Sequence, residues 1–191
     1  MPLIVPPPFE TPRLVVRAVD RDDLAGLMQV NGDAEVTRFL PYATWLSIAD
    51  ANAWYERMAK LQATGTAAQL VLIGKAAGAP VGTFLLFKHD EGARRAEVGY
   101  VLARAHWGTG LMREALRAVA AQAFGPLGLR RLEAEVDPAN VASTRVLERV
   151  GFVREGLLRQ RWLRDQRPYD VAIYGLLGDE FEDTATADRS R

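Results

Sequence analysis

With 191 residues, the chain is long enough to fold as one domain with a sizeable core. Its 24 lysine and arginine residues balance 24 acidic residues, and a net charge of zero disfavours DNA as a main partner, because binding a polyanion requires a basic surface. Cysteine is absent and histidine occurs twice, which excludes disulfides and cysteine nucleophiles and disfavours a metal site. No apolar run approaches the roughly 20 residues of a membrane span, so we expect a cytoplasmic protein with neither a membrane nor a nucleic-acid partner.

The first third of the chain is predicted to contain an extended arm, one strand and three helices. Residues 1–12 hold five of the ten prolines, which favour extended backbone. Residues 13–19 alternate between apolar and polar side chains as a strand does. Ser47 and Asp50 have the spacing of a capping box, which typically opens a helix. The three helices are expected to begin at Asp20, Asp33 and Ser47 and to end at Gly32, Pro41 and Gly65.

From residue 68 the hydrophobic period becomes extended, which predicts a sheet. Strands are expected over residues 68–74, 81–87, 95–102, 132–136, 152–162 and 169–177, with a hairpin loop at 89–92 and a helix over 143–150 that ends at a left-handed Gly151. This order is typical of an α+β fold with a mixed, mostly antiparallel central sheet of six to seven strands, flanked by helices. We therefore expect an extended arm (1–12), a single domain (13–178) and a flexible C-terminal tail (179–191).

A glycine-rich turn, residues 107–110, lies between the strand at 95–102 and an amphipathic helix that begins at Leu111. Such a turn leaves backbone N–H groups unpaired at the helix start and lets an anion approach them closely. Arg113 breaks the dinucleotide-binding pattern, and the only Gly-Lys pair, at residues 74–75, lacks the rest of a Walker loop. The turn is a candidate phosphate cradle made of backbone, and a plain tight turn is the alternative.

Four separated motifs together resemble those of the GNAT N-acetyltransferases. Residues 96–100 with 107–115 resemble the acetyl-CoA-binding core of that family, residues 140–156 resemble its second hallmark, and residues 11–17 and 170–177 are similar to its RimJ/RimL branch. That branch acetylates the N-termini of ribosomal proteins. The resemblance spans residues 11–181 and implies a GNAT fold, acetyl-CoA as cosubstrate without a metal, and an amine acceptor, and it leaves a homodimer open.

The resemblance also assigns residues to acetyl-CoA. They are Tyr100, Val101, Leu102, Trp107, Gly108, Thr109, Gly110, Leu111, Met112, Asn140 and Ser143. The family usually has Gln or Arg three residues before the first loop glycine, whereas this chain has Ala105 there, next to Arg104. This departure affects one side-chain contact and leaves the backbone cradle intact.

Acetyl transfer to an amine requires a group that removes a proton, because an α-amine has a pKa of about 8 and a lysine of about 10.4. Glu97 is the candidate general base, since it lies on the strand beside the proposed cofactor loop. The period of two places Glu97 on the same face as Gly99 and Val101. The alternative is that Glu97 only pairs with Arg94 or Arg95 on a solvated face.

The reaction also needs donors for the carbonyl oxygen and for the departing thiolate. By resemblance, backbone N–H groups around residues 99–102 stabilise the oxygen, freed by a β-bulge in that strand. Ser143 is the candidate proton donor to the thiolate, and Asn140 the residue that holds the pantetheine arm or the start of its helix. Both residues are also good N-caps, so capping alone is the alternative role.

Other residues carry weaker signals. His106 precedes the loop and either contacts a phosphate or is merely exposed. Phe39, Trp45, Trp54 and Tyr55 either line an acceptor pocket or belong to the core. Arginines at 159, 161, 164 and 167 either bind an acidic acceptor or lie on a solvated hairpin.

The predicted activity is acetyl-CoA-dependent acetylation of a primary amine, such as a protein N-terminal α-amine, by direct attack in a ternary complex. A covalent serine mechanism is disfavoured because the chain has no Gly-x-Ser-x-Gly motif. A small-molecule amine or an antibiotic is an alternative acceptor. A different class of function is a catalytically silent CoA-binding sensor, which would need the glycine turn but neither Glu97 nor Ser143.

Overall fold

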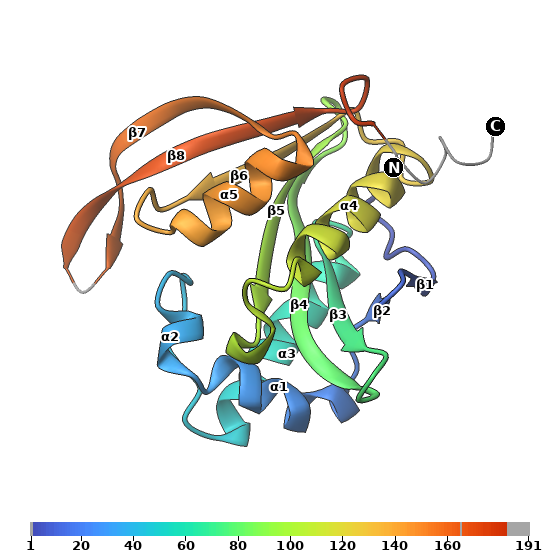
Figure 1. The fold of residues 1–191 in the computed structure, drawn as a ribbon, viewed down its shortest axis with the longest axis vertical. Coiled ribbons are helices and arrows are strands. Elements are labelled where there is room, and N and C mark those ends of the chain that lie inside the picture. Colours follow the sequence, from blue (N-terminus) through green and yellow to red (C-terminus); the bar gives the residue numbers. More distant parts are fainter. Residues whose placement is uncertain (1, 165, 183–191) are drawn as a thin grey trace.

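An eight-stranded sheet runs through the part of the chain that the computed structural model describes, residues 2–164 and 166–182 (Figure 1). Its strands are β1 (Phe9–Glu10), β2 (Leu14–Ala18), β3 (Ala68–Gly74), β4 (Ala79–Asp90), β5 (Arg95–Leu102), β6 (Arg131–Val136), β7 (Val153–Arg164) and β8 (Arg167–Leu177). They lie in the order β1-β2-β3-β4-β5-β6-β8-β7, and every neighbouring pair is antiparallel except β5 and β6. The α+β class and the mixed, mostly antiparallel sheet are confirmed.

The sheet has eight strands rather than six to seven because part of the proline-rich arm joins it. Phe9 and Glu10 of β1 lie opposite Val16 and Val15 of β2. A two-residue strand has no alternation of its own, so the sequence pattern gives no sign of this pairing. The loop expected at residues 89–92 is also shifted, since β4 continues through Asp90 and the turn occupies residues 91–94.

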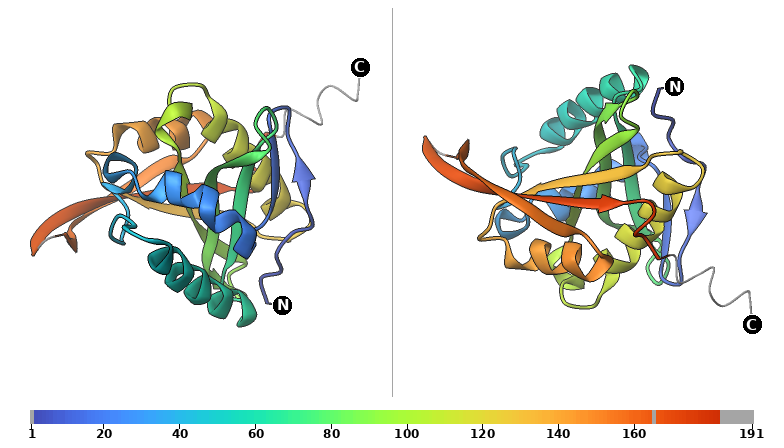
Figure 2. Two further views of the ribbon diagram at one scale, coloured as in Figure 1. Left: turned by 90° about the horizontal axis from the view of Figure 1, so that it is seen from below. Right: turned by 90° about the horizontal axis from the view of Figure 1, so that it is seen from above.

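Helices cover both faces of the sheet. α1 (Leu24–Asn31) and α3 (Ile48–Ala63) pack on one face, and α4 (Leu111–Phe124) and α5 (Val141–Val150) pack on the other (Figure 2). Consecutive residues of β3 are therefore all buried: Leu70 and Leu72 belong to the core under α4, and Val71 belongs to the core under α1 and α3. Burial on both faces explains why this strand is an uninterrupted apolar run.

Local capping signals place several helix ends where the sequence predicts them, but two expectations are wrong. The helix expected to run from Asp33 to Pro41 ends at Thr37, because residues 38–41 turn away from the helical path, and the segment after Asp20 opens with a 3₁₀ turn, so that α1 begins at Leu24. Asp33 accepts a hydrogen bond from the backbone N–H of Glu35 at the start of the short α2 (Ala34–Thr37), and Ser47 begins α3. Gly151 ends α5 with a φ of 111°, in the left-handed region that favours glycine. These ends depend on residues within one turn, which explains why a local pattern predicts them.

The strands β5 and β6 run side by side only at their first residues. Arg95 to Glu97 of β5 pair with Arg131 to Glu133 of β6, while β4 accompanies β5 as far as Leu102. Within the described residues, the stretch of β5 from Val98 to Leu102 has no strand on its β6 side. The two strands therefore separate directly after Glu97, and this opening positions the site described below.

The last described residues fold back on α4. The ring of Phe181 packs against that of Phe124, with the ring centroids 5.4 Å apart. Residues 183–191 of the expected C-terminal tail lie outside the described residues. Within residues 2–164 and 166–182, no helix combines the length and the apolar character needed to cross a membrane.

Candidate active site

A cavity of about 480 Å³ opens where β5 and β6 separate. Its walls come from the segment after α2, from α3, from β3 to β6, from the start of α5 and from the β7–β8 hairpin. Five residues that the sequence assigns to catalysis or to acetyl-CoA line this one cavity: Glu97, Tyr100, Val101, Asn140 and Ser143. Residues more than 40 positions apart in the chain thus meet at one place, as acyl transfer requires.

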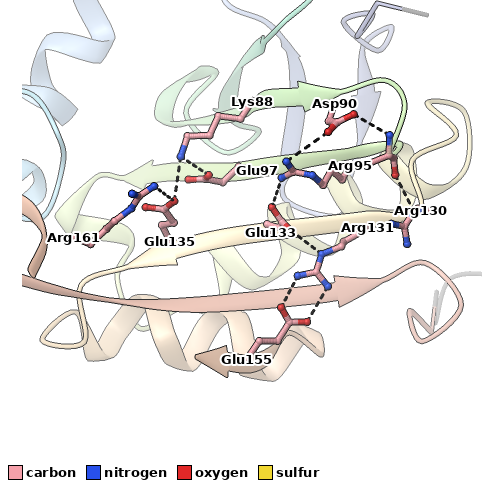
Figure 3. Close-up of polar contacts among 11 residues, drawn as sticks. Lys88, Asp90, Arg95, Glu97, Arg130, Arg131, Glu133, Glu135, Glu155 and Arg161 are labelled. Carbon is pink, nitrogen blue, oxygen red and sulfur yellow. Dashed lines mark hydrogen bonds and ion pairs between the residues drawn. The ribbon is translucent and has the colours of Figure 1, made fainter. Parts of the chain in front are cut away.

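Glu97 lies at the point where the strands separate and is 7% exposed. Its carboxylate accepts a hydrogen bond from the ammonium of Lys88 at 2.7 Å, and the same ammonium lies 3.2 Å from Glu135 of β6 (Figure 3). Burial raises the pKa of Glu97, partly offset by the Lys88 charge. The alternative pairing with Arg94 or Arg95 is not found, and Arg95 extends toward Glu133 at 2.6 Å.

The bulge expected in β5 lies in its neighbour instead. The register of β4 with β5 is regular from Gly82 to Phe87 and shifts between Phe87 and Asp90. Lys88 lies in that shift with a φ of 49°. Backbone N–H groups of β5 beyond Glu97 are left without a neighbouring strand by the separation from β6, rather than by a bulge of their own.

Ser143 and Tyr100 form a hydroxyl pair on the opposite face of β5 from Glu97. The phenol oxygen of Tyr100 lies 2.9 Å from the Ser143 Oγ, and burial raises the pKa of the phenol. Asn140 caps α5, since its Oδ1 accepts from the backbone N–H of Ser143 at 3.2 Å. The capping role predicted for Asn140 is therefore present, while the Ser143 hydroxyl is directed to Tyr100.

The glycine turn has the geometry expected of an anion cradle. Gly108 and Gly110 have φ values of 72° and 78°, which favour glycine, and a Cβ added at Gly108 would meet nothing within 4 Å. Among the described residues, no protein acceptor is found for the backbone N–H groups of residues 108–113. The turn thus presents a row of free donors at the N-terminus of α4, next to open space.

A brace that the sequence pattern did not predict holds this turn; we call Thr11, Arg13 and Glu114 the N-terminal brace. The Glu114 carboxylate accepts from the Thr11 hydroxyl at 2.6 Å and from the Arg13 backbone N–H and Nε at 2.9 and 2.6 Å. Arg13 also donates to the carbonyl of Thr109 at 3.0 Å. Burial disfavours ionisation of Glu114, but these hydrogen bonds outweigh it and lower its pKa.

The polar groups of the side chains around the turn bond to nearby backbone carbonyls. The Trp107 indole donates to the carbonyl of Leu102 at 2.8 Å, and the Thr109 hydroxyl donates to the carbonyl of His106 at 2.7 Å. The side chains of Leu111 and Met112 are buried in the core under α4, as is that of Leu102, so these residues have only backbone to offer a ligand. Arg104, which stands beside Ala105, is paired with Asp33 at 3.0 Å.

Comparison with known proteins assigns the chain to a family. The model of the acetyltransferase (GNAT) domain matches residues 13–153. The chain belongs to the GNAT acetyltransferase family. It is an acetyltransferase, as the sequence motifs predict, and enzymes of this family use acetyl-CoA.

Individual relatives agree with this assignment. The GNAT chain is 33% identical over 171 residues to the uncharacterized N-acetyltransferase p20 of Bacillus licheniformis, covering 90% of this chain and 96% of that protein. Its fold is similar to that of Mycobacterium smegmatis RimJ in complex with CoA-disulfide (TM-score 0.82, 24% identity, 98% of this chain and 90% of that one). It is also similar to that of spermidine N-acetyltransferase from Vibrio cholerae in complex with CoA and spermine (TM-score 0.77, 22% identity, 89% and 98%). The resemblance to the RimJ/RimL branch is confirmed at the level of the family.

The remaining sequence candidates of this GNAT chain divide between the cavity and the core. Phe39 and Trp54 line the cavity, whereas Trp45 packs on Trp54 with ring centroids 5.3 Å apart and Tyr55 lies under the guanidinium of Arg21. Of the hairpin arginines, Arg161 lies 3.9 Å from Glu135 and Arg164 lies 2.9 Å from Asp137. Among residues 2–164 and 166–182 there is no cluster of side chains suited to hold a metal ion.

The sequence pattern did not single out several charged and aromatic residues of the cavity, among them Lys88, Glu135 and Trp162. Lys88 was placed at the edge of an expected loop, and Glu135 and Trp162 lay inside expected strands with no motif around them. Glu135 stands two residues after Glu133 and two before Asp137, so a run of acidic residues on one face of β6 was the available signal.

Proposed function

We propose that this GNAT enzyme transfers the acetyl group of acetyl-CoA to a primary amine by direct attack while both substrates are bound. The observation that carries the proposal is the cavity at the strand opening, where a buried carboxylate and a hydroxyl pair lie on the two faces of β5. Acetyl-CoA would supply an activated thioester carbonyl. The chain's own residues would orient the substrates and move the protons.

The glycine turn and α4 suit the diphosphate of coenzyme A. The free N–H groups of residues 108–113 offer donors at a helix N-terminus, where an anion is favoured, and the N-terminal brace fixes the carbonyl side of the turn through Thr109. The adjacent edge of β5 from Val98 to Leu102 has further backbone groups without a strand partner in the described chain. These would hold the pantetheine amides and donate to the carbonyl oxygen as it becomes negative.

Glu97 would accept the proton of the acceptor ammonium. Burial raises the pKa of Glu97, partly offset by Lys88, and a carboxylate with a raised pKa is a stronger base than an exposed one. Ser143 would donate a hydrogen bond or a proton to the departing thiolate, and Tyr100 would keep the serine hydroxyl oriented. Because the two groups lie on opposite faces of β5, one serves the amine and the other serves the thiol.

For the acceptor, we propose a peptide or protein N-terminal α-amine, in keeping with the RimJ-like fold. The likeness to spermidine N-acetyltransferase, together with carboxylates of Glu97, Glu135 and Asp137 in the cavity wall, favours a small cationic amine as a second candidate. The test is turnover of acetyl-CoA with three acceptors: a peptide with a free N-terminus, its N-terminally blocked form, and spermidine.

Acetylation of the free peptide at its α-amine, and not of the blocked form, would support the first acceptor. Preferential turnover of spermidine would support the second. Binding of acetyl-CoA without turnover of any amine would identify a silent sensor. Failure to bind acetyl-CoA at all would contradict the whole proposal.

A further inference from the structure

Lys88 enters the cavity because of the bulge in β4. The backbone of Lys88 has a φ of 49°, in the left-handed region that residues other than glycine rarely adopt. The extra residue in β4 lies between the pairs Phe87–Glu97 and Asp90–Arg95, next to Glu97, and the Lys88 side chain extends over β5 toward β6 (Figure 3). Backbone strain of this kind persists only where the surrounding structure holds it, and it is common at functional sites.

The Lys88 ammonium lies in a cage of two carboxylates and two aromatic rings. It is 2.7 Å from the Glu97 carboxylate and 3.2 Å from that of Glu135, and it lies 5.4 Å from the ring centroid of Phe87 and 5.9 Å from that of Trp162. Carboxylates and aromatic faces are the partners that bind ammonium ions in proteins. The cage draws on four strands, β4 to β7.

The groups around the cage hold its carboxylates in place. The Trp162 indole donates to Glu135 Oε2 at 2.8 Å, and Arg161 lies 3.9 Å from Glu135 Oε1. The side chains of Glu97 and Glu135 are 10% and 17% exposed, whereas that of Lys88 is 45% exposed. The carboxylates are thus fixed in the wall, while the lysine reaches them from the solvent side and can swing away on its four-carbon stem.

We propose that the cage of Glu97, Glu135, Phe87 and Trp162 is the binding site for the acceptor's primary ammonium group, and that Lys88 occupies this site in the free enzyme. The acceptor ammonium displaces that of Lys88 and takes its hydrogen bond to Glu97. This inference rests on the proposed function for the identity of the ligand. It goes further by giving the ammonium a place and by making Lys88 an internal competitor that sets the enzyme's affinity for amines.

Two features of the geometry support displacement over a fixed ion pair. The Lys88 ammonium is chemically the same group as the amine that must be deprotonated, and it already contacts the candidate base. A lysine fixed for stability alone would not need to line a cavity of about 480 Å³ that also holds Ser143 and Tyr100. Only the lysine end of the pair is exposed, and an incoming ammonium would replace its charge at the buried Glu97, so the exchange leaves no carboxylate unpaired.

The test measures the affinity of the full chain for n-butylammonium at pH 8 and constant ionic strength. Binding is monitored by calorimetry or by the NMR signal of the Trp162 indole N–H. If Lys88 fills the cage in about nine molecules of ten, the Lys88→Met variant should bind butylammonium about tenfold more tightly. Lys88→Arg, which keeps a cation in the cage, should bind no more tightly than the parent. Lys75→Met, which removes a surface lysine paired with Glu10, is the matched control and should change nothing.

1-Butanol has the same shape as the probe without the charge, and it should gain no affinity in Lys88→Met. An equal gain in affinity for butanol would show that the substitution only enlarges the cavity. An unchanged affinity for butylammonium would show that Lys88 is not a competitor. Either result overturns the inference. Because the readout is binding, it is independent of turnover. Tighter butylammonium binding in Lys88→Met without acetylation of any amine would uphold the cage and refute the proposed function. Acetylation of an amine with unchanged butylammonium affinity in Lys88→Met would uphold the proposed function and refute the cage.

Discussion

Replacing Glu114 by glutamine tests how much the N-terminal brace contributes to the cofactor turn. The carboxylate accepts three hydrogen bonds, from Thr11 Oγ1 and from the backbone N–H and Nε of Arg13. Glutamine offers one oxygen and turns an NH₂ group toward the remaining donors. Hydrogen bonds to charged groups contribute about 1.5–3 kcal/mol each when buried. Since Arg13 is about half-exposed, we expect a total loss of about 1–3 kcal/mol in the free energy of unfolding.

Thermal unfolding followed by circular dichroism measures this loss, at roughly 2–4 °C in Tm per kcal/mol for a chain of this size. The pKa of Glu114 is lower in the folded than in the unfolded chain, so its contribution is complete above the ordinary carboxyl pKa and disappears as pH falls through the lowered value. The difference in stability between the parent and Glu114→Gln should therefore be constant at neutral pH and shrink below about pH 4.

The matched control is Glu10→Gln, which breaks an exposed pair with Lys75. It should cost less than about 0.5 kcal/mol. Glu114→Gln should also weaken coenzyme A binding, because the Arg13 side chain that contacts Thr109 loses its anchor. Equal losses of stability in the two variants, or a difference that persists unchanged in acid, would refute this account of the brace.

Two further pairs of variants separate function from structure. Gly108→Ala and Gly78→Ala both place a side chain at a positive φ in open space, so each should lower the free energy of unfolding by about 1 kcal/mol. Only Gly108→Ala should weaken coenzyme A binding, by about tenfold. Equal coenzyme A affinities of the two variants in a titration would contradict the cradle. Ser143→Ala keeps the backbone N–H that Asn140 caps and should lower kcat about tenfold or more with little change in Tm, whereas Asn140→Ala should lose about 1 kcal/mol in the same melts. An unchanged kcat in Ser143→Ala would leave that serine without a chemical role.

The fold was predictable where local signals determine it. The capping residues Asp33 and Ser47, the left-handed Gly151 and the four-residue period from Leu111 act within one or two turns, and each gave the right helix end. What depends on distant partners was not predictable. The two-residue β1 exists only because β2 pairs with it.

The same distinction applies to the site. Recognisable motifs predict Glu97, Tyr100 and Ser143 as site residues, and one cavity brings the three together. The alternative partners considered for Glu97 were its sequence neighbours Arg94 and Arg95, whereas a bulge in the adjacent strand brings Lys88 to it instead. Contacts between residues about 100 positions apart, such as that of Arg13 with Glu114, leave no trace in a local pattern.

The pH dependence of kcat/KM for an amine acceptor, in the parent enzyme and in Glu97→Gln, tests the central claim most directly. In the parent, the rate should fall in acid with an apparent pKa above that of an ordinary glutamate, because burial raises the pKa of Glu97. In Glu97→Gln, kcat should drop by about 10²–10⁴-fold and that acid limb should disappear, while the KM for acetyl-CoA stays within about twofold. A variant with the parent's rate and the parent's pH profile would contradict the claim that Glu97 removes the proton.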